Sequence, residues 1–306
     1  MKWRMFICAI CFLIGGCSLN IPLEDQFSDP DAITDVLSAR SLLASAYKAM
    51  PQQIFQLSVL SDDFCPSQHL NKDMSLQGLY NWREVEMTEL AGTLWAGYYA
   101  VIAEVNALLA RIDAVVTLDE TEKLEKMRIV CEAKALKSWC YFDLLRLFAP
   151  RYEGNENKDG IILKKRVELD FLPRSSVKEC VTEIRTLLNE ARNVDNTQKN
   201  VYWLSDKAVA YLQVELELYA GNYPAVLELT KDLETEYPES VLGADVYKYL
   251  WSSENSDARI FGKYQLEQIY MDIRFDTFEK GDYLVLSQNV DYEEEDIRKE
   301  WSEIPF

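Results

Sequence analysis

The chain has 306 residues, and its 51 Asp and Glu against 32 Lys and Arg give a formal net charge of −19 at pH 7. With 48% hydrophobic and 12% aromatic residues, it can bury a large core, which excludes a disordered chain. No basic stripe interrupts the acidic surface, so phosphate backbones would be repelled and nucleic acid is excluded as a partner. Anionic lipid surfaces are disfavoured for the same reason. The length allows one large domain or two small ones.

Residues 1–16 have the pattern of an export signal. Lys2 and Arg4 precede an apolar run at residues 5–14, followed by two glycines. The run is too short to cross a bilayer as a helix, because about 20 residues are needed for that. The segment therefore predicts a cleaved signal peptide.

Cys17 directly follows the glycine pair, and residues 13–17 (LIGGC) resemble the bacterial lipobox. In that motif the cysteine thiol is acylated and becomes the mature N-terminus, so we expect residues 17–32 to be a lipidated tether. Acyl chains add about 0.8 kcal/mol per buried methylene, and several of them anchor a protein stably in a membrane. Ser18 after the cysteine favours the outer membrane. An ordinary signal peptide with an incidental cysteine is the alternative.

Helical periodicity dominates from residue 33 onward. Apolar residues recur at steps of three and four, and proline, glycine and capping residues mark the ends of the runs. Residues 52–92 are less regular, and short strands are expected at 259–261 and 283–286. The expected helices cover 33–50, 95–112, 117–148, 176–191, 205–219 and 224–233.

Several of these helix ends carry specific capping signals. Residues 117–120 and 176–179 have the form of capping boxes, Ser205 is an expected N-cap, and Gly221 is an expected left-handed C-cap. The last two helices, joined by a Gly-Asn turn, have the form of a tetratricopeptide repeat unit. We therefore expect a mostly α protein of tetratricopeptide-like helix pairs, with an irregular loop-rich lobe and a few short strands.

The sequence contains no recognisable catalytic motif. The single histidine, His69, has no nucleophile motif near it, and GxSxG, HExxH and glycine-rich phosphate loops do not occur. The pair Asp62-Asp63 could serve glycoside hydrolysis, which needs two carboxyl groups about 5–9 Å apart. Adjacent acids are expected by chance among 51 acidic residues. We therefore expect no enzymatic activity, no cofactor and no metal, and a glycosidase is the weakest alternative.

Aromatic and acidic residues outside the helical stripes form the candidate binding site. An exposed aromatic ring can stack on the apolar C–H face of a sugar, while neighbouring Asp, Asn or Arg groups bind the hydroxyls. Any single one of these rings can equally cover the core at a loop, so the set supports binding more than any member does. The candidate ligand-binding residues are Asp62, Asp63, Tyr80, Trp82, Tyr202 and Trp203.

Sequence motifs of a known family occur in the same chain. Residues 94–106 (LWAGYYAVIAEVN) resemble the "LWxxxYxxIxxxN" helix of SusD/RagB-type outer-membrane lipoproteins of Bacteroidetes. Residues 132–148 (EAKALKSWCYFDLLRLF) resemble their "EAKxLRAxxYFDLVRxFG" helix, with Lys137 where that motif has Arg. Residues 174–177 match the family's "RxSV" helix start, and residues 296–298 resemble its "DxR" segment.

The resemblance implies a non-catalytic surface lipoprotein, lipidated at Cys17. Such a protein binds a glycan or another nutrient oligomer and delivers it to a partner TonB-dependent, SusC-like transporter in the outer membrane. The family's C-terminal motifs are not found in this sequence, so residues 33–306 are expected to form a short or C-terminally truncated SusD-like helical-repeat domain. The alternative function is an envelope helical-repeat lipoprotein that acts as a protein-interaction scaffold.

Overall fold

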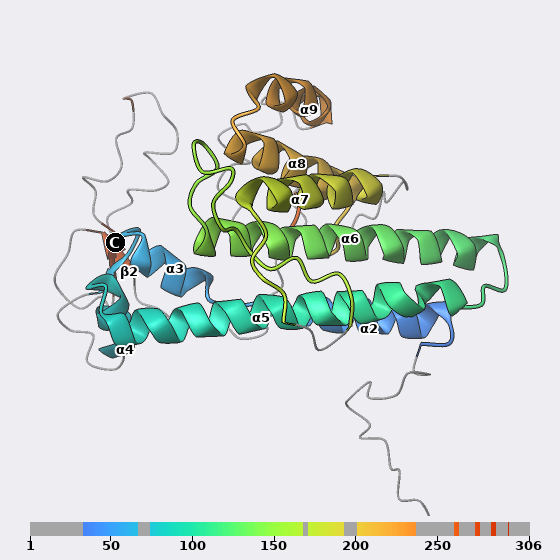
Figure 1. The fold of residues 1–306 in the computed structure, drawn as a ribbon, viewed down its shortest axis with the longest axis horizontal. Helices are drawn as coiled ribbons and strands as arrows, with labels where there is room; N and C mark the ends of the chain where they lie inside the picture. The colour runs from blue at the N-terminus through green and yellow to red at the C-terminus, as the bar shows by residue number, and fades with distance from the viewer. Residues whose placement is uncertain are drawn as a thin grey trace, which may run out of the picture.

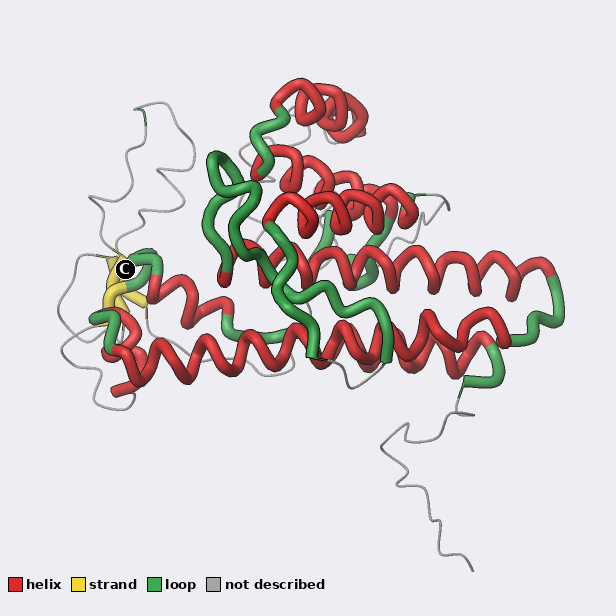
Figure 2. The backbone as a smooth tube through the Cα atoms, viewed as in Figure 1, coloured by secondary structure: helices red, strands yellow, loops and turns green. Residues whose placement is uncertain are grey.

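The computed structural model of the chain describes residues 33–66, 74–167, 171–192, 201–236, 260–262, 273–275, 283–285 and 293. The expected signal peptide at 1–16, Cys17 and the tether at 17–32 lie outside the described residues, as do His69 and the segment 296–298. Within the described part, helices make up most of the backbone, and the strands are short (Figure 2). The mostly α fold class predicted from the sequence is confirmed.

Two long helices, α5 and α6, are accompanied by shorter helices and very short strands. The helices are α2 (Val36–Lys48), α3 (Ile54–Leu60), α4 (Met74–Tyr80), α5 (Glu84–Arg111), η1 (Ile112–Ala114), α6 (Glu120–Phe148), α7 (Val177–Ala191), α8 (Asp206–Tyr219) and α9 (Tyr223–Glu236). The strands are β1 (Cys65–Pro66), β2 (Ile273–Phe275) and β3 (Tyr283–Val285).

The helices α5 and α6 lie antiparallel at the centre of the fold, and α2 packs against both of them. On the other side of α6, the helices α7, α8 and α9 follow one another in successive layers (Figure 1). The interfaces between these layers contain fully buried aliphatic side chains such as Leu43, Ile102, Leu136 and Ile184. Each such side chain contributes about 1.5–3 kcal/mol when it leaves water. The layered packing therefore holds the two long helices as a rigid support.

A long loop between α6 and α7 crosses both long helices (Figure 2). Side chains of α5 and α6 hold it in place by hydrogen bonds. The hydroxyl of Tyr99 donates to the carbonyl of Ile162 and accepts from its N–H, both at 2.9 Å. The carbonyl of Lys164 accepts from Asn106 Nδ2 at 2.9 Å and from the Tyr141 hydroxyl at 2.6 Å. Backbone groups of a loop have no partners in a helix or sheet. These side-chain bonds supply the partners for the backbone groups of Ile162 and Lys164.

Most of the capping signals act as the sequence predicts. Ser176 accepts from the N–H of Glu179 at 3.3 Å, and the Glu179 carboxylate accepts from the N–H of Ser176 at 2.8 Å, which completes the capping box of α7. Ser205 accepts from the N–H of Ala208 at 3.2 Å at the start of α8. Gly221 ends α8 with a φ of +70°. Each of these side-chain caps contributes about 1 kcal/mol.

Three local predictions are wrong. The helix expected from residue 95 begins earlier, because α5 starts at Glu84. The N-cap of α6 is Asp119 rather than Thr117, because the Asp119 carboxylate accepts from the N–H of Glu122 at 2.8 Å. The predicted strand at 259–261 is also not formed: Ile260 and Phe261 are loop residues. The ring of Phe261 instead packs edge-on against Trp139, with ring centroids 5.1 Å apart. Packing against the helical core thus overrides the β propensity of this apolar run.

A small sheet of order β1-β3-β2 lies beside α3 and α4, at one end of the long axis (Figure 1). The strand β1 pairs antiparallel with β3, with Cys65 opposite Leu284, and β2 pairs parallel with β3. The strand at 283–285 confirms the prediction for 283–286, whereas β2 was not predicted. Through this sheet, residues near the end of the chain are joined to the turn that follows α3.

Candidate functional site

The helices α3 and α4 end in the same backbone motif. After α3, the N–H of Asp62 donates to the carbonyl of Val59, and the N–H of Asp63 donates to that of Ser58 at 2.9 Å. After α4, the N–H of Trp82 donates to Leu79 O at 2.9 Å, and the N–H of the next residue, at position 83, donates to the carbonyl of residue 78. These paired bonds define a Schellman motif at each end, which places Asp62 and Trp82 at the left-handed position.

Asp62 and Trp82 have φ values of +65° and +55°, and among the described residues they are the only non-glycine residues with positive φ. Helix α8 ends in the same way, but it has Gly221 at this position, with a φ of +70°. The left-handed conformation costs an ordinary L-residue about 1–2 kcal/mol, which glycine avoids. For a side chain as bulky as Trp82, a positive φ is a clear outlier. Strain of this kind concentrates at functional sites.

The two turns lie next to each other, because α3 packs against α4 and β1 contacts α4. A hydrogen bond with the Cys65 side chain, then partial burial and the charges of Cys65 and Asp62, raise the pKa of Tyr80 to about 12. This phenol therefore stays protonated at neutral pH and lies close to the Asp62 turn. We call this group of Asp62, Asp63, Tyr80 and Trp82 the α3–α4 tip.

The α3–α4 tip presents one large aromatic surface and two carboxylates to solvent. Trp82 is 64% exposed, and Asp62 and Asp63 are exposed as well. The Ser61 hydroxyl donates to Asp63 Oδ2 at 2.9 Å, which fixes the orientation of that carboxylate. A ring face beside acceptors for hydroxyl hydrogen bonds is the arrangement that binds a pyranose. Ser61 was missed by sequence reasoning, although a Ser two residues before an Asp is a local hydrogen-bonding signal.

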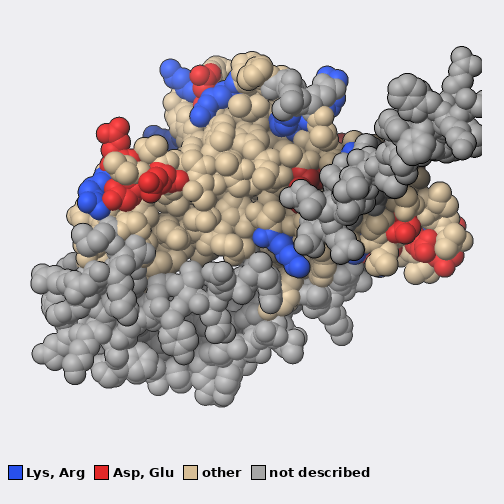
Figure 3. Space-filling view, turned by 90° about the horizontal axis from the view of Figure 1, so that it is seen from below, with Lys and Arg blue, Asp and Glu red and all other residues tan. Residues whose placement is uncertain are grey.

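The surface around the tip is acidic. The first turn of α5 contains Glu84 and Glu86, and the four carboxylates of Asp62, Asp63, Glu84 and Glu86 outnumber Arg83, which follows Trp82 and pairs with Glu86. In the view of Figure 3, acidic side chains gather near the two ends of the long axis, and the stretch between them shows mostly uncharged atoms. An anionic ligand would be repelled at the tip, so the electrostatics favour a neutral or cationic one.

The other two candidate residues, Tyr202 and Trp203, do not join the tip. The Trp203 ring packs edge-on against Tyr47 of α2, with centroids 5.1 Å apart, and the Arg40 guanidinium lies 4.9 Å from the Trp203 ring centroid. Arg40 is bonded to Glu132 of α6, which lies five residues before Lys137, the partner of Asn106 on α5. At 1.5 Å per residue, about 36 Å of helix separates Asn106 from Trp82. Trp203 thus covers the core at the start of α8, and the candidate set divides into two groups.

Among the described residues, no group of three or more His, Cys, Asp or Glu side chains could hold a metal ion. Cys65, Cys131, Cys140 and Cys180 are all free thiols.

The layered helices define a helical-repeat protein with an exposed aromatic, acidic tip. Residues 23–214 match the family model of SusD-like proteins described as "starch-binding associating with outer membrane", and the chain belongs to this family. A comparison with curated proteins finds no match.

Solved structures with the same fold come from the same superfamily. A SusD superfamily protein from Bacteroides vulgatus matches with a TM-score of 0.61 and 20% identity, over 74% of this chain and 53% of its own. Surface glycan-binding protein A from Bacteroides fluxus matches with a TM-score of 0.56 and 18% identity, over 82% of this chain and 54% of its own. A laminarin-binding SusD-like protein matches with a TM-score of 0.50 and 19% identity, over 66% of this chain and 44% of its own. The chain spans about half the length of these structures.

Proposed function

We propose that this chain is an outer-membrane surface lipoprotein that binds a glycan at the α3–α4 tip and delivers it to a partner TonB-dependent transporter. The observation that carries the proposal is Trp82, a 64% exposed aromatic side chain held in a left-handed backbone conformation that a glycine would adopt without strain. Two exposed carboxylates, Asp62 and Asp63, and the phenol of Tyr80 surround it as hydrogen-bonding groups.

The comparisons support a carbohydrate as the ligand. The family description names starch, and the structural relatives include a laminarin-binding protein and a surface glycan-binding protein. In this proposal the tip binds without catalysis, because stacking and hydroxyl recognition need no nucleophile or general base.

The proposed placement depends on the N-terminal segment. Residues 1–16 would be the cleaved signal peptide, acylated Cys17 would anchor the chain through the tether at 17–32, and residues 33–306 would form the binding domain. The family description "associating with outer membrane" supports this placement. Metabolic labelling with a radioactive fatty acid should label the wild-type chain and fail to label a Cys17→Ala variant.

Replacing Trp82 with glycine should separate binding from folding. The change removes the stacking surface and relieves the left-handed strain, so glycan affinity should fall at least tenfold, about 1.4 kcal/mol. The free energy of unfolding should stay the same or rise by about 1 kcal/mol. Isothermal titration calorimetry with maltoheptaose and laminarihexaose measures the first quantity, and urea denaturation measures the second.

Val85 provides the matched control, because it is 66% exposed on the first turn of α5, three residues from Trp82. A Val85→Ala variant should bind the same oligosaccharide as the wild type does. Wild-type affinity in the Trp82→Gly protein would show that the tip is not the binding site.

A protein-interaction scaffold is the second candidate function. The observation that favours it is the exposed apolar side chains of α9, Tyr223 and Leu227. If the wild-type chain binds no glycan and a Leu227→Ser change releases a co-purifying envelope protein, the scaffold replaces the glycan-binding proposal.

A further inference from the structure

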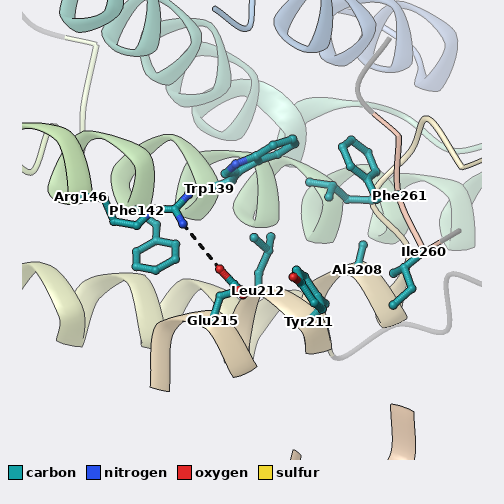
Figure 4. A pocket seen from close by; sticks show the side chains of 10 residues that line it. Trp139, Phe142, Arg146, Ala208, Tyr211, Leu212, Glu215, Ile260 and Phe261 are labelled. Carbon is teal, nitrogen blue, oxygen red and sulfur yellow. Dashed lines mark ion pairs between the residues drawn. The ribbon is translucent and has the colours of Figure 1, made fainter. Parts of the chain in front are cut away.

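The C-terminal half of α6 carries aromatic and charged side chains on one face. Phe142, Asp143 and Arg146 follow Trp139 by three, four and seven residues, so all three lie on the same side of the helix as Trp139. Figure 4 shows Trp139, Phe142 and Arg146 opposite Tyr211 and other side chains of α8. We call Trp139 and Arg146, which mark the two ends of this row, the α6 ridge.

A chain of polar contacts runs through the α6 ridge from α5 to α8. The Tyr98 hydroxyl donates to Asp143 Oδ2 at 2.9 Å. Arg146 Nη2 lies 2.5 Å from Asp143 Oδ1, and Arg146 Nη1 lies 3.5 Å from Glu215 Oε2, the ion pair drawn in Figure 4. The Arg146 guanidinium also lies 4.5 Å from the ring centroid of Phe142. These contacts fix the polar groups before any ligand arrives, which reduces the entropy lost on binding.

Two cavities adjoin the α6 ridge, and both are lined by Trp139 and Arg146. The larger has a volume of about 560 Å³ and lies between α6, α8 and residues 260–261. Its size falls within the range of about 300–1,000 Å³ that is usual for small-ligand sites. The smaller, of about 260 Å³, lies between α3, α5 and α6 and is lined by Gln53 and Leu94, among others.

Gln53 gives an independent sign that a ligand enters the smaller cavity. Its side-chain Oε1 is buried and, among the described residues, has no hydrogen-bond partner. A buried acceptor without a donor costs about 1–3 kcal/mol. A ligand hydroxyl in the cavity that Gln53 lines would supply the donor.

We propose that the α6 ridge and its two cavities form a second binding site, for a neutral oligosaccharide. The aromatic side chains Trp139 and Tyr211 offer apolar surfaces for sugar rings, and Glu215 and Arg146 offer an acceptor and a donor for hydroxyls. The choice of an oligosaccharide as the ligand rests on the proposed function. The position of the site does not, because it is inferred from the two cavities and from Gln53.

Charge and backbone geometry select this ligand among the alternatives. Asp143 and Glu215 outnumber Arg146, which is already paired with both, so a ligand carboxylate or sulfate would meet net negative charge. The walls of the larger cavity come mainly from the interiors of α6 and α8, where backbone N–H and C=O groups bond within the helix. An extended peptide would find few main-chain partners there, whereas hydroxyl groups can bond to the side chains.

The ridge and the tip are tested separately through the larger cavity, because its residues Tyr211 and Glu215 belong to α8, whereas the smaller cavity is also lined by Ile54 and Leu57 of α3, the helix that ends at the tip. We would titrate maltoheptaose and laminarihexaose by calorimetry into the wild-type chain, a Trp82→Gly variant and variants that add Tyr211→Ala or Glu215→Gln to Trp82→Gly. The Trp82→Gly chain should keep saturable binding. Adding either cavity change should weaken that binding at least tenfold.

Tyr223→Ala in the Trp82→Gly chain is the matched control, because Tyr223 is an exposed tyrosine on α9 outside the cavity. It should leave the residual binding unchanged. Denaturation of each variant should confirm an unchanged fold, which is expected because Tyr211 is 46% exposed.

Four results would overturn the second site. If Trp82→Gly alone abolishes all binding, the ridge is not a site and the proposed function stands. The ridge is likewise excluded if residual binding survives both cavity changes, or if polygalacturonate binds the ridge more tightly than the neutral glucans. If the wild-type chain binds none of the glucans, both the second site and the proposed function fail.

Discussion

Replacing Arg40 with methionine is expected to lower the free energy of unfolding by about 3–5 kcal/mol, because it removes the positive charge that faces the buried carboxylate of Glu132. The side chain of Glu132 is fully buried on α6, and its Oε2 lies 2.8 Å from Arg40 Nη1. Arg40 Nη2 also lies 2.5 Å from Glu125 Oε1, so one guanidinium joins α2 to two positions on α6. Burial opposes the charged form, but the hydrogen bond and charge of Glu132 raise the pKa of Arg40 above its ordinary value.

Urea denaturation followed by circular dichroism measures the loss, and two further variants test its cause. Arg128→Met removes a partly exposed pair with Glu125, whose atoms are 3.9 Å apart, and should cost less than about 1 kcal/mol. The double variant Arg40→Met with Glu132→Met should be more stable than Arg40→Met alone, since the carboxylate that faced Arg40 is removed as well. A loss below about 1 kcal/mol for Arg40→Met, or no recovery in the double variant, would contradict this explanation.

The helices that could be predicted from the sequence are those whose ends carry a side-chain signal. Ser176, Ser205 and Gly221 each act through one residue and its near neighbours, so their effect is visible in the sequence. The periodicity predicts that α5 starts at 95, but the helix starts at Glu84. The sequence does not show this start, because the N-cap residue Arg83 makes no side-chain capping bond. A helix start without a capping residue has no local signal, and it is fixed by packing against α4.

The sequence names the residues of the α3–α4 tip by their type, but it does not show that they lie together. Asp62 and Trp82 belong to separate turns, and only the packing of α3 against α4 brings those turns together. Their left-handed backbone is also invisible in the sequence, because the usual signal for it is a glycine. Trp203 has the same sequence context as Trp82, an aromatic residue next to a helix, but the Arg40 guanidinium lies over its ring. An aromatic residue in this context can cover the core or face a ligand. Its solvent exposure separates these two roles, and that exposure depends on the tertiary fold.

The family motif on α6 contains a second buried charge, Lys137, which has no carboxylate bonded to it in the described part of the chain. Lys137 is 4% exposed, and its Nζ donates to Asn106 Oδ1 at 2.6 Å. Burial, with the opposing charges of Glu183 and Lys165 as smaller influences, lowers its pKa from 10.5 to about 8. The corresponding SusD/RagB motif has Arg at this position. An arginine would stay charged there, whereas Lys137 can lose its proton within an accessible pH range.

The contribution of Lys137 to the free energy of unfolding should therefore increase with pH above about 8. Between the folded pKa of about 8 and the unfolded value of 10.5, the native chain has lost a proton that the unfolded chain still holds, so raising the pH favours the native state. Each pH unit in this window contributes about 1.4 kcal/mol at most, which gives about 2 kcal/mol between pH 8 and 9.5. Urea denaturation at several pH values measures the change.

A Lys137→Met variant isolates this contribution from the other groups that titrate. Burial raises the pKa of Cys180 and of Tyr99, and these groups reduce stability as the pH rises past their unfolded values. Their effect is common to both proteins and cancels in the difference between wild type and variant. Methionine leaves Asn106 Oδ1 without its donor, a cost of about 1–3 kcal/mol that does not change with pH. The free energy of unfolding of the wild type, relative to that of the variant, should thus increase by about 2 kcal/mol from pH 8 to 9.5. Parallel pH profiles would show that Lys137 keeps its proton in the folded chain.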